Sequence, residues 1–217
     1  NNLDESWFYK FDRWGNFLDS IPQPIRDSRK GLRNLTYHQG YVYAVNFEAE
    51  AIIKIDPANW DSVGGWQLPQ DAGSPHCPAI DNDGNFWVSA VVNRIYKLEL
   101  VGDSVLVEVT SFTRPDPENR ENMLRNYGFA WFRDDPHGFN LYMVSSDART
   151  NDFAIHKMHP ETGEIRFLTA LPYLREGSRG KGGICITPKW NNLVWVMGII
   201  SPVQKVFRIV TSGLGET

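Results

Sequence analysis

Short stretches in which apolar and polar residues alternate recur along the whole chain, with the two-residue period of a β-strand that buries one face. Five of these stretches are centred on a basic residue, at Lys10, Lys54, Lys97, Lys157 and Arg208. Successive basic residues lie 44, 43, 60 and 51 positions apart. Because Lys and Arg are common at exposed strand positions, one or two matches carry little weight, but five indicate a repeat. The pattern therefore predicts one strand that recurs five times.

A second predicted strand precedes each of the last four basic strands and carries an aromatic residue at an equivalent place. These aromatic residues are Tyr43, Trp87, Tyr142 and Trp195. Each basic residue follows its aromatic residue by 10 to 15 positions. That distance fits a strand, a short loop and the start of the next strand, so the two predicted strands form a hairpin.

Two more strands complete the repeat. An earlier strand and a turn with Gly or Asn, residues that supply the positive φ of tight hairpins, come before the aromatic strand. We expect these earlier strands at 32–38, 75–81, 127–133 and 182–188. A fourth strand is expected after the basic strand, at 17–21, 63–68, 105–109 and 165–168. The polar run 118–125 is expected to form a loop with one helical turn.

Four antiparallel strands in every 43 to 60 residues are the period of a β-propeller blade. One such sheet cannot bury both of its faces, so blades must stack on one another. We therefore predict an all-β chain whose residues 1–211 form a β-propeller of four-stranded antiparallel blades. The complete blades are expected at 31–69, 74–112 and 126–172, and partial blades at 5–22 and 182–211. Residues 212–217 are interpreted as a linker or tail.

The two partial blades leave the closure of the ring open. Residues 5–22 supply the last two strands of a blade and residues 182–211 the first three, so a shared blade would contain one strand too many. Closure as a four-bladed ring is one alternative. We favour the other, a segment of a ring of six to eight blades, since unpaired blade edges promote aggregation.

Charge and cysteine content narrow the function classes. The net charge of −4 argues against general nucleic-acid binding, which needs a basic surplus. No stretch of about 18 apolar residues is present, so no membrane span is expected in this chain. Cys77 and Cys185 are too few and too far apart for a zinc site, and we favour two free thiols over a disulfide.

Two turn-and-strand motifs resemble known propeller repeats. The segment 81–88, Asp-Asn-Asp-Gly-Asn-Phe-Trp-Val, resembles the repeat core of two-component sensor ectodomains of bacteria. The segment 155–164, Ile-His-Lys-Met-His-Pro-Glu-Thr-Gly-Glu, is similar to a unit of surface-layer and NHL-type propellers. These motifs specify architecture and not chemistry. The resemblance implies a bacterial protein that is secreted, periplasmic or on the cell surface, often with further domains in the same polypeptide.

The loops that join one blade to the next are the expected ligand site, because they meet at one mouth of a propeller channel. Loops 24–33 and 173–182 carry net charges of +3 and +2, loop 113–126 is neutral and loop 70–76 carries −1. Their sum is +4, so the rest of the chain totals −8. This segregation predicts a positive field that attracts a carboxylate, a phosphate or an acidic glycan. The candidate ligand-binding residues are Arg26, Arg29, Arg33, His76, Arg120, Arg125, Arg175, Arg179 and Lys181.

Other chemistry has weaker support in the sequence. Residues 81–85 resemble a calcium loop, but Val92 stands where an EF-hand loop needs a bidentate Glu, so we interpret them as a turn and predict no cofactor. His76 has no nucleophile beside it in the sequence. A channel-centred metal would have Asn34, Asn93, Asn126 and Asp147 as its candidate oxygen ligands, without the acidic residues that such sites require. Aromatic residues outside the core register can stack on sugars or partner proteins, but we expect them to pack between blades; they are Phe47, Trp60, Trp66, Trp131 and Trp190.

The sequence therefore favours a non-catalytic binding or scaffolding module that recognises a protein or an anionic glycan through its basic inter-blade loops. One alternative is a metal-dependent hydrolase, a lactonase-like enzyme or a lyase with a channel-centred site. A further alternative is a ligand-sensing ectodomain.

Overall fold

A computed structural model of the 217-residue chain shows an all-β protein, as predicted: every regular element among the described residues is a strand. The structure describes residues 6–12, 14, 16–25, 31–70, 75–89, 94–113, 124–147, 153–171, 184–187, 193–200 and 203–210. In this part of the chain no helix is long and apolar enough to span a membrane.

Three four-stranded antiparallel sheets, here called blades 1 to 3, form the middle of the chain. Blade 1 contains β3 (Leu32–His38), β4 (Tyr41–Asn46), β5 (Ala51–Ile55) and β6 (Ser62–Gln67). Blade 2 contains β7 (His76–Ile80), β8 (Phe86–Ser89), β9 (Arg94–Val101) and β10 (Val105–Thr113). Blade 3 contains β11 (Leu124–Trp131), β12 (Leu141–Asp147), β13 (Phe153–Met158) and β14 (Ile165–Ala170).

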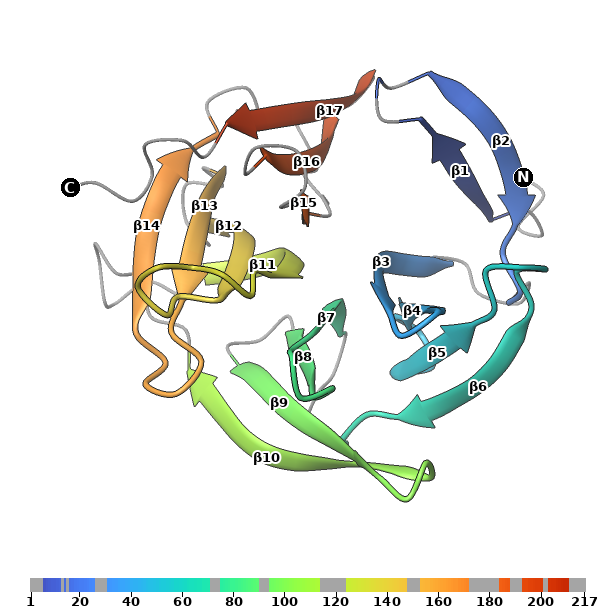
Figure 1. Cartoon of the computed structure of the whole chain (residues 1–217), viewed down its shortest axis with the longest axis horizontal. Coiled ribbons are helices and arrows are strands. Elements are labelled where there is room, and N and C mark those ends of the chain that lie inside the picture. The colour runs from blue at the N-terminus through green and yellow to red at the C-terminus, as the bar shows by residue number, and fades with distance from the viewer. Residues whose placement is uncertain are drawn as a thin grey trace.

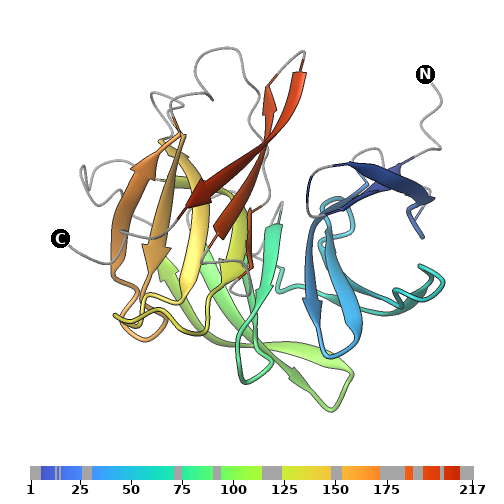
Figure 2. The same ribbon diagram turned by 45° about the horizontal axis from the view of Figure 1, so that its top comes forward.

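Two partial sheets flank the three blades, as the fold prediction requires. The first contains β1 (Trp7–Phe11) and β2 (Phe17–Pro22). The second contains β15 (Ile184–Thr187), β16 (Leu193–Ile200) and β17 (Val203–Val210). The five sheets are arranged around a central axis, with β3, β7, β11 and β15 innermost (Figures 1 and 2). Within the described residues the two partial sheets do not merge, since β1 pairs with β2 and β17 pairs with β16.

Apolar cores lie between neighbouring sheets, which is the packing that defines a propeller. The core between blades 1 and 2 joins Ile52 and Trp66 to Phe86 and Tyr96. Equivalent cores join blade 2 to blade 3, blade 3 to β15, and blade 1 to β1 through Phe8. Each fully buried large side chain contributes about 1.5–3 kcal/mol to such a core. The blades therefore stabilise one another rather than standing alone.

Most of the flagged aromatic residues pack between sheets, as expected. The Trp60 ring lies 5.5 Å from Phe8 of β1, and the Trp131 ring stacks 6.1 Å from Trp87 of blade 2. Trp66 is buried, and its indole N–H donates to the backbone oxygen of Asp103 in blade 2 at 3.1 Å. Trp190 lies outside the described residues.

The repeated aromatic and basic residues are direct cross-strand partners. Tyr43 pairs with Lys54, Trp87 with Lys97, Tyr142 with Lys157 and Trp195 with Arg208. The sequence repeat is thus the second and third strands of each blade in one common register. In blades 2 and 3 the Lys ammonium reaches an Asp carboxylate that also accepts from the aromatic partner, at Asp81 and Asp135 respectively.

Asp135 is the centre of the blade 3 network. Its Oδ2 accepts from the Tyr142 hydroxyl at 2.7 Å and from Lys157 Nζ at 3.3 Å, and its Oδ1 accepts from the backbone N–H groups of His137 and Phe139 at 2.9 and 3.0 Å. Burial alone would raise the pKa of Asp135, but these hydrogen bonds and the Lys157 charge hold that pKa below its ordinary value. Burial, together with this bond to a carboxylate, raises the pKa of Tyr142.

Asp81 organises the 81–85 segment in the same way, which confirms that segment as a turn. Its Oδ1 accepts from the backbone N–H groups of Asp83 and Asn85, and its Oδ2 accepts from the Trp87 indole at 3.1 Å. Gly84 adopts a φ of 88°, as such a turn needs. Among the described residues no group of three His, Cys, Asp or Glu side chains could hold a metal ion.

One inner strand begins earlier than predicted. β11 starts at Leu124, so Leu124 and Arg125 are strand residues and the expected helical turn at 118–125 is wrong for them; residues 118–123 lie outside the described part. Leu124 is buried, and Asn126 is buried with its side chain hydrogen-bonded to Ser145. The polar residues of this segment do not indicate a strand from sequence alone. The buried Asn126 side chain is tolerated because its hydrogen-bond partner is Ser145 of the neighbouring strand rather than water.

Gly163 allows blades 2 and 3 to approach closely, and its replacement tests this contact. It adopts a φ of 71°, and a Cβ there would collide with the Phe112 ring of β10. We expect Gly163→Ala to destabilise the protein by about 1–3 kcal/mol in urea unfolding, from backbone strain and the collision. Gly102→Ala is the matched control, because Gly102 has a φ of 59° and nothing within 4 Å of its Cβ position. Equal losses for the two variants would contradict the proposed contact.

Candidate functional site

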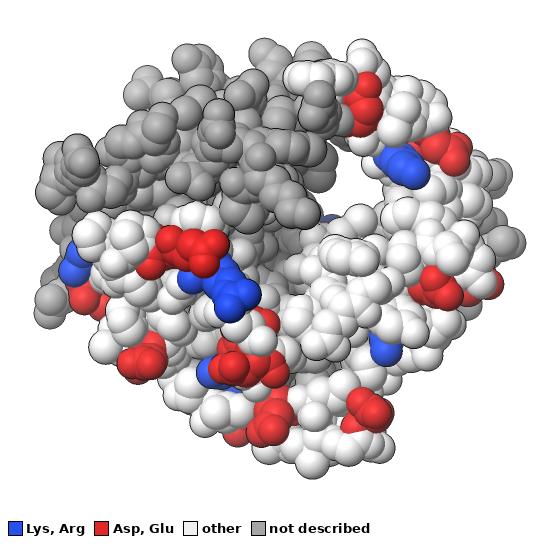
Figure 3. Space-filling view, viewed as in Figure 1, with Lys and Arg blue, Asp and Glu red and all other residues white. Residues whose placement is uncertain are grey.

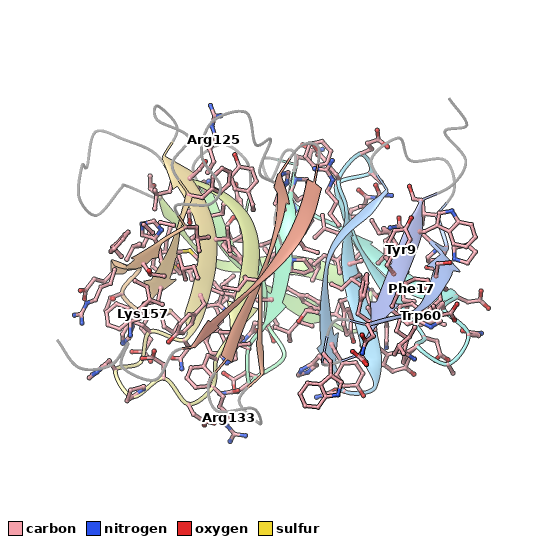
Figure 4. All side chains as sticks on the ribbon, turned by 90° about the horizontal axis from the view of Figure 1, so that it is seen from above. Tyr9, Phe17, Trp60, Arg125, Arg133 and Lys157 are labelled. Carbon is pink, nitrogen blue, oxygen red and sulfur yellow. The ribbon has the colours of Figure 1, made fainter. Side chains whose placement is uncertain are left out.

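Three inner strands each contain a β-bulge close to their first residues, at one end of the channel. In β3 the residue Asn34 bulges between Arg33 and Leu35, and in β11 Tyr127 bulges between Asn126 and Gly128. The pairing of β7 shifts in the same way between His76 and Ala79. A bulge redirects side chains and is frequent beside binding sites. We call this end, at which these strands begin, the upper face; Arg125 marks it in Figure 4, and Arg133 marks the opposite, lower face.

Four side chains from three blades meet at the upper face, and we name them the mouth cluster: Arg33, Phe47, His76 and Tyr127. The His76 ring lies between two aromatic rings, 5.2 Å from that of Phe47 and 6.1 Å from that of Tyr127. The Arg33 guanidinium lies 4.8 Å from the centre of the Phe47 ring, which is a cation–π distance. The Arg33 guanidinium and the His76 ring are therefore both held against aromatic rings at the channel mouth.

Hydrogen bonds around the mouth cluster fix its geometry. The Asn34 side-chain amide donates to the backbone oxygen of Tyr127 at 2.7 Å, which ties blade 1 to blade 3. Asn34 has a φ of 47°, a left-handed conformation that Asn tolerates better than most residues. The Tyr127 ring also packs 5.3 Å from Phe153 at the start of β13. Three side chains of the mouth cluster thus stand on strands, and Phe47 stands on the short turn between β4 and β5.

Arg33 is the charged side chain of the mouth cluster, and a carboxylate acts on it. Burial lowers the pKa of Arg33, and the Glu48 carboxylate opposes this effect. Since an Arg pKa starts above about 12, the guanidinium remains charged at neutral pH. His76 is buried, with Nδ1 3.0 Å from the backbone oxygen of Pro75. That oxygen can only accept, so Nδ1 carries the hydrogen, which leaves Nε2 as the acceptor in the neutral ring.

Three of the nine predicted site residues lie in the described part of the chain. The structure brings Arg33 and His76 together around Phe47, and Arg125 lies exposed at the same face, where it pairs in register with Ser146 of β12. The other six lie outside the described residues: Arg26, Arg29, Arg120, Arg175, Arg179 and Lys181.

Sequence reasoning missed Tyr127 and expected Phe47 to pack between blades. Tyr127 directly follows a polar pair and precedes Gly128, a combination typical of a bulge. Such a signal was therefore present in the sequence. Phe47 directly follows β4, in the turn to β5, and contacts Arg33 and His76 rather than a neighbouring blade's core.

The side chains considered as metal ligands are engaged otherwise where the structure describes them. Asn34 donates to Tyr127, while Asn126 accepts from the Ser145 hydroxyl at 2.8 Å and donates to Met143 Sδ at 3.7 Å. The side chains of Asn93 and Asp147 lie outside the described part, as do those of Cys77 and Cys185.

Comparisons with known proteins support the fold. The chain resembles the Dos1 propeller at 14% identity and a TM-score of 0.50, over 95% of this chain and 49% of that one. Virginiamycin B lyase from Staphylococcus aureus matches at 15% identity and a TM-score of 0.49, over 96% of this chain and 64% of the lyase. The Swd1 propeller domain from Myceliophteria thermophila matches at 14% identity and a TM-score of 0.48, over 91% and 60%.

These neighbours include an enzyme and other propellers. The likeness to the Dos1 propeller, at 14% identity, shows the fold alone. The chain spans less than two thirds of the length of each of these three neighbours. No family model matches the sequence, and no curated protein matches it.

Proposed function

We propose that this chain is a binding module that captures an anionic ligand at the upper face of its propeller channel. The observation that carries the proposal is the convergence of Arg33, His76 and Phe47 from two blades, closed on the third side by Tyr127. A guanidinium whose position is fixed against an aromatic ring loses little entropy when it binds a carboxylate or phosphate.

The ligand class that fits best is an acidic glycan. Aromatic rings such as Phe47 and Tyr127 can stack on the apolar face of a sugar, while the Arg33 guanidinium can donate to its carboxylate. In the sequence, the segments 24–33 and 173–182 carry net charges of +3 and +2. Such a ligand agrees with the secreted or cell-surface setting that the resemblance to bacterial propeller repeats implies.

Binding to an array of uronic-acid and sulfated oligosaccharides tests this function. We expect Arg33→Ala to weaken binding about tenfold or more, because a hydrogen bond to a charged group contributes about 1.5–3 kcal/mol. Rising salt concentration should also weaken the binding of these oligosaccharides by the wild-type protein. Arg133→Ala is the matched control, since Arg133 lies on the opposite face (Figure 4).

Two results would contradict the proposal. One is retention of acidic-glycan binding by Arg33→Ala. The other is an equal loss in Arg133→Ala, which would indicate attraction by charge alone. A thermal unfolding curve for each variant separates loss of the site from loss of the fold.

A further inference from the structure

The lower half of the channel contains a second site that the upper-face ligand does not use. A cavity of about 360 Å³ lies among the inner strands of blades 1 to 3 and β15. Its walls include Leu35 and Val42 of blade 1, Ile80 of blade 2, Phe129 of blade 3 and Ile184 of β15. Its volume falls within the range of ligand pockets, about 300–1,000 Å³. A pocket of this size, lined mostly by apolar side chains, is a candidate site for apolar side chains of a ligand.

Aromatic rings stand where the cavity meets the lower face. Tyr37 is 68% exposed at the end of β3, and Leu35 beside it is 44% exposed. Trp131 lines the cavity at the end of β11, with its ring stacked on Trp87 and its indole N–H donating to Asn82 Oδ1 at 3.3 Å. Rings of Tyr and Trp attract cations through their faces. The rim therefore favours a positively charged group over a neutral one.

The lower face is also strongly acidic. The described residues of the seven turns at this end contain ten carboxylates and a single Lys or Arg, Arg133. Figure 3, which views this face, shows Asp and Glu as the prevailing charged groups of the described surface. Asp81 and Asp135 are bound to lysines inside their blades, Glu164 is paired with Arg166 at 2.8 Å, and the other seven are at least partly exposed. The ten are Asp12, Asp56, Asp61, Asp81, Asp83, Asp103, Asp134, Asp135, Glu161 and Glu164.

We propose that the lower face binds a basic peptide segment whose apolar side chains enter the cavity between β3, β7, β11 and β15. Lys or Arg side chains of the segment would lie on the Tyr37 and Trp131 rings and on exposed carboxylates such as Asp83 and Asp134. Charge complementarity selects this occupant, since an apolar molecule without charge would not use the acidic turns. The inference does not depend on the upper-face function, because the two sites share no residue.

Fluorescence anisotropy with three labelled 12-residue peptides tests the proposal. One peptide combines Leu, Trp and Lys, a second replaces each Lys by Glu, and a third replaces each Lys by Gln. We expect the Lys peptide to bind and the Glu peptide to bind at least about tenfold more weakly, with a loss of affinity as salt rises. An uncharged peptide with Gln at the same places should also bind more weakly than the Lys peptide.

Matched variants place the peptide on this face. Leu35→Arg adds a positive charge to the cavity wall and should weaken binding of the Lys peptide about tenfold or more. Tyr37→Ala should weaken it roughly threefold or more through loss of a cation–π partner. Leu18→Arg and Tyr9→Ala are the controls, because both residues are similarly exposed but lie on the β1–β2 sheet. The upper-face variant Arg33→Ala should leave this binding unchanged.

Several results would overturn the proposal. These are no binding of the Lys peptide, equal binding of the Gln peptide, or an unchanged affinity in both Leu35→Arg and Tyr37→Ala. Equal binding of the Gln peptide would identify the cavity as a site for neutral apolar ligands instead. Failure of the acidic-glycan test alone would leave the lower-face result standing, so the two proposals fail separately.

Discussion

Replacing Asp135 by Ala should destabilise the protein by about 3–5 kcal/mol in urea unfolding at neutral pH. The carboxylate is fully buried and the Lys157 side chain is only 8% exposed. Removal of Asp135 leaves this cation without its counter-ion and removes the acceptor of Tyr142 and of two backbone N–H groups. Each of these losses carries the cost of a buried polar group whose partner has gone.

Asp134→Ala is the control for this effect. Asp134 precedes Asp135 directly but is exposed, and we expect its loss to change stability by no more than about 0.5 kcal/mol. A loss for Asp135→Ala as small as that of Asp134→Ala would show that the network contributes little.

The pH dependence gives the network a second signature. Because the pKa of Asp135 is lowered in the folded protein, its ionised form stabilises the fold fully above the unfolded-state pKa of about 4. That contribution is lost as the pH falls through the lower, folded-state pKa. The stability difference between the wild type and Asp135→Asn should therefore shrink as the pH falls below about 4, measured by urea unfolding at each pH. A difference that stays constant across this range would contradict the lowered pKa.

The blade repeat was readable from the sequence because it rests on local rules. The alternation around Lys54, Lys97 and Lys157 sets the buried face of each strand, and the cross-strand register then places an aromatic residue opposite each Lys. Turn residues such as Gly84 marked the hairpins by the φ that they permit. Both signals lie within a few residues, so no tertiary information was needed.

For Asp81 and Asp135 the sequence indicates the turn that each residue caps, but not the ion pair with a Lys of the third strand. Asp81 and Asp135 each precede a Gly by three residues, and both cap a turn with backbone hydrogen bonds. That the same carboxylates also hold Lys97 and Lys157 depends on the third strand of each blade. Blade 1 has no Asp at this place, and Lys54 instead lies 3.8 Å from the centre of the Tyr41 ring.

The mouth cluster could be predicted only in part. Arg33 and His76 were chosen from loop charge and strand position, but their meeting around Phe47 depends on the bulges of β3 and β7. A bulge shifts the side-chain alternation by one residue, and periodicity alone does not locate it. Periodicity did not indicate Tyr127 for this reason, because Tyr127 is the bulged residue and does not follow the side-chain alternation of β11.

Replacing Trp87 by Ala should destabilise the protein by about 3–5 kcal/mol in urea unfolding, as much as the loss of Asp135. Trp87 is completely buried between blades 2 and 3, where its ring stacks on Phe112 at 6.4 Å and on Trp131 at 6.1 Å. Trp14→Ala, at a 70% exposed residue, is the control and should change stability by no more than about 0.5 kcal/mol.

The strands that lose protection in Trp87→Ala distinguish a stacked-blade architecture from a single cooperative core. In stacked repeats an interface residue acts mainly on the two units that it joins. In Trp87→Ala we therefore expect hydrogen exchange to accelerate most in β7 to β14 and least in β3 and β4. Trp87→Phe keeps most of the apolar contact but removes the indole donor to Asp81 Oδ2. Its free energy of unfolding should therefore fall by less, about 1–3 kcal/mol. Uniform acceleration across all strands would contradict the stacked-blade account, because the interface would then not be separable from the rest of the fold.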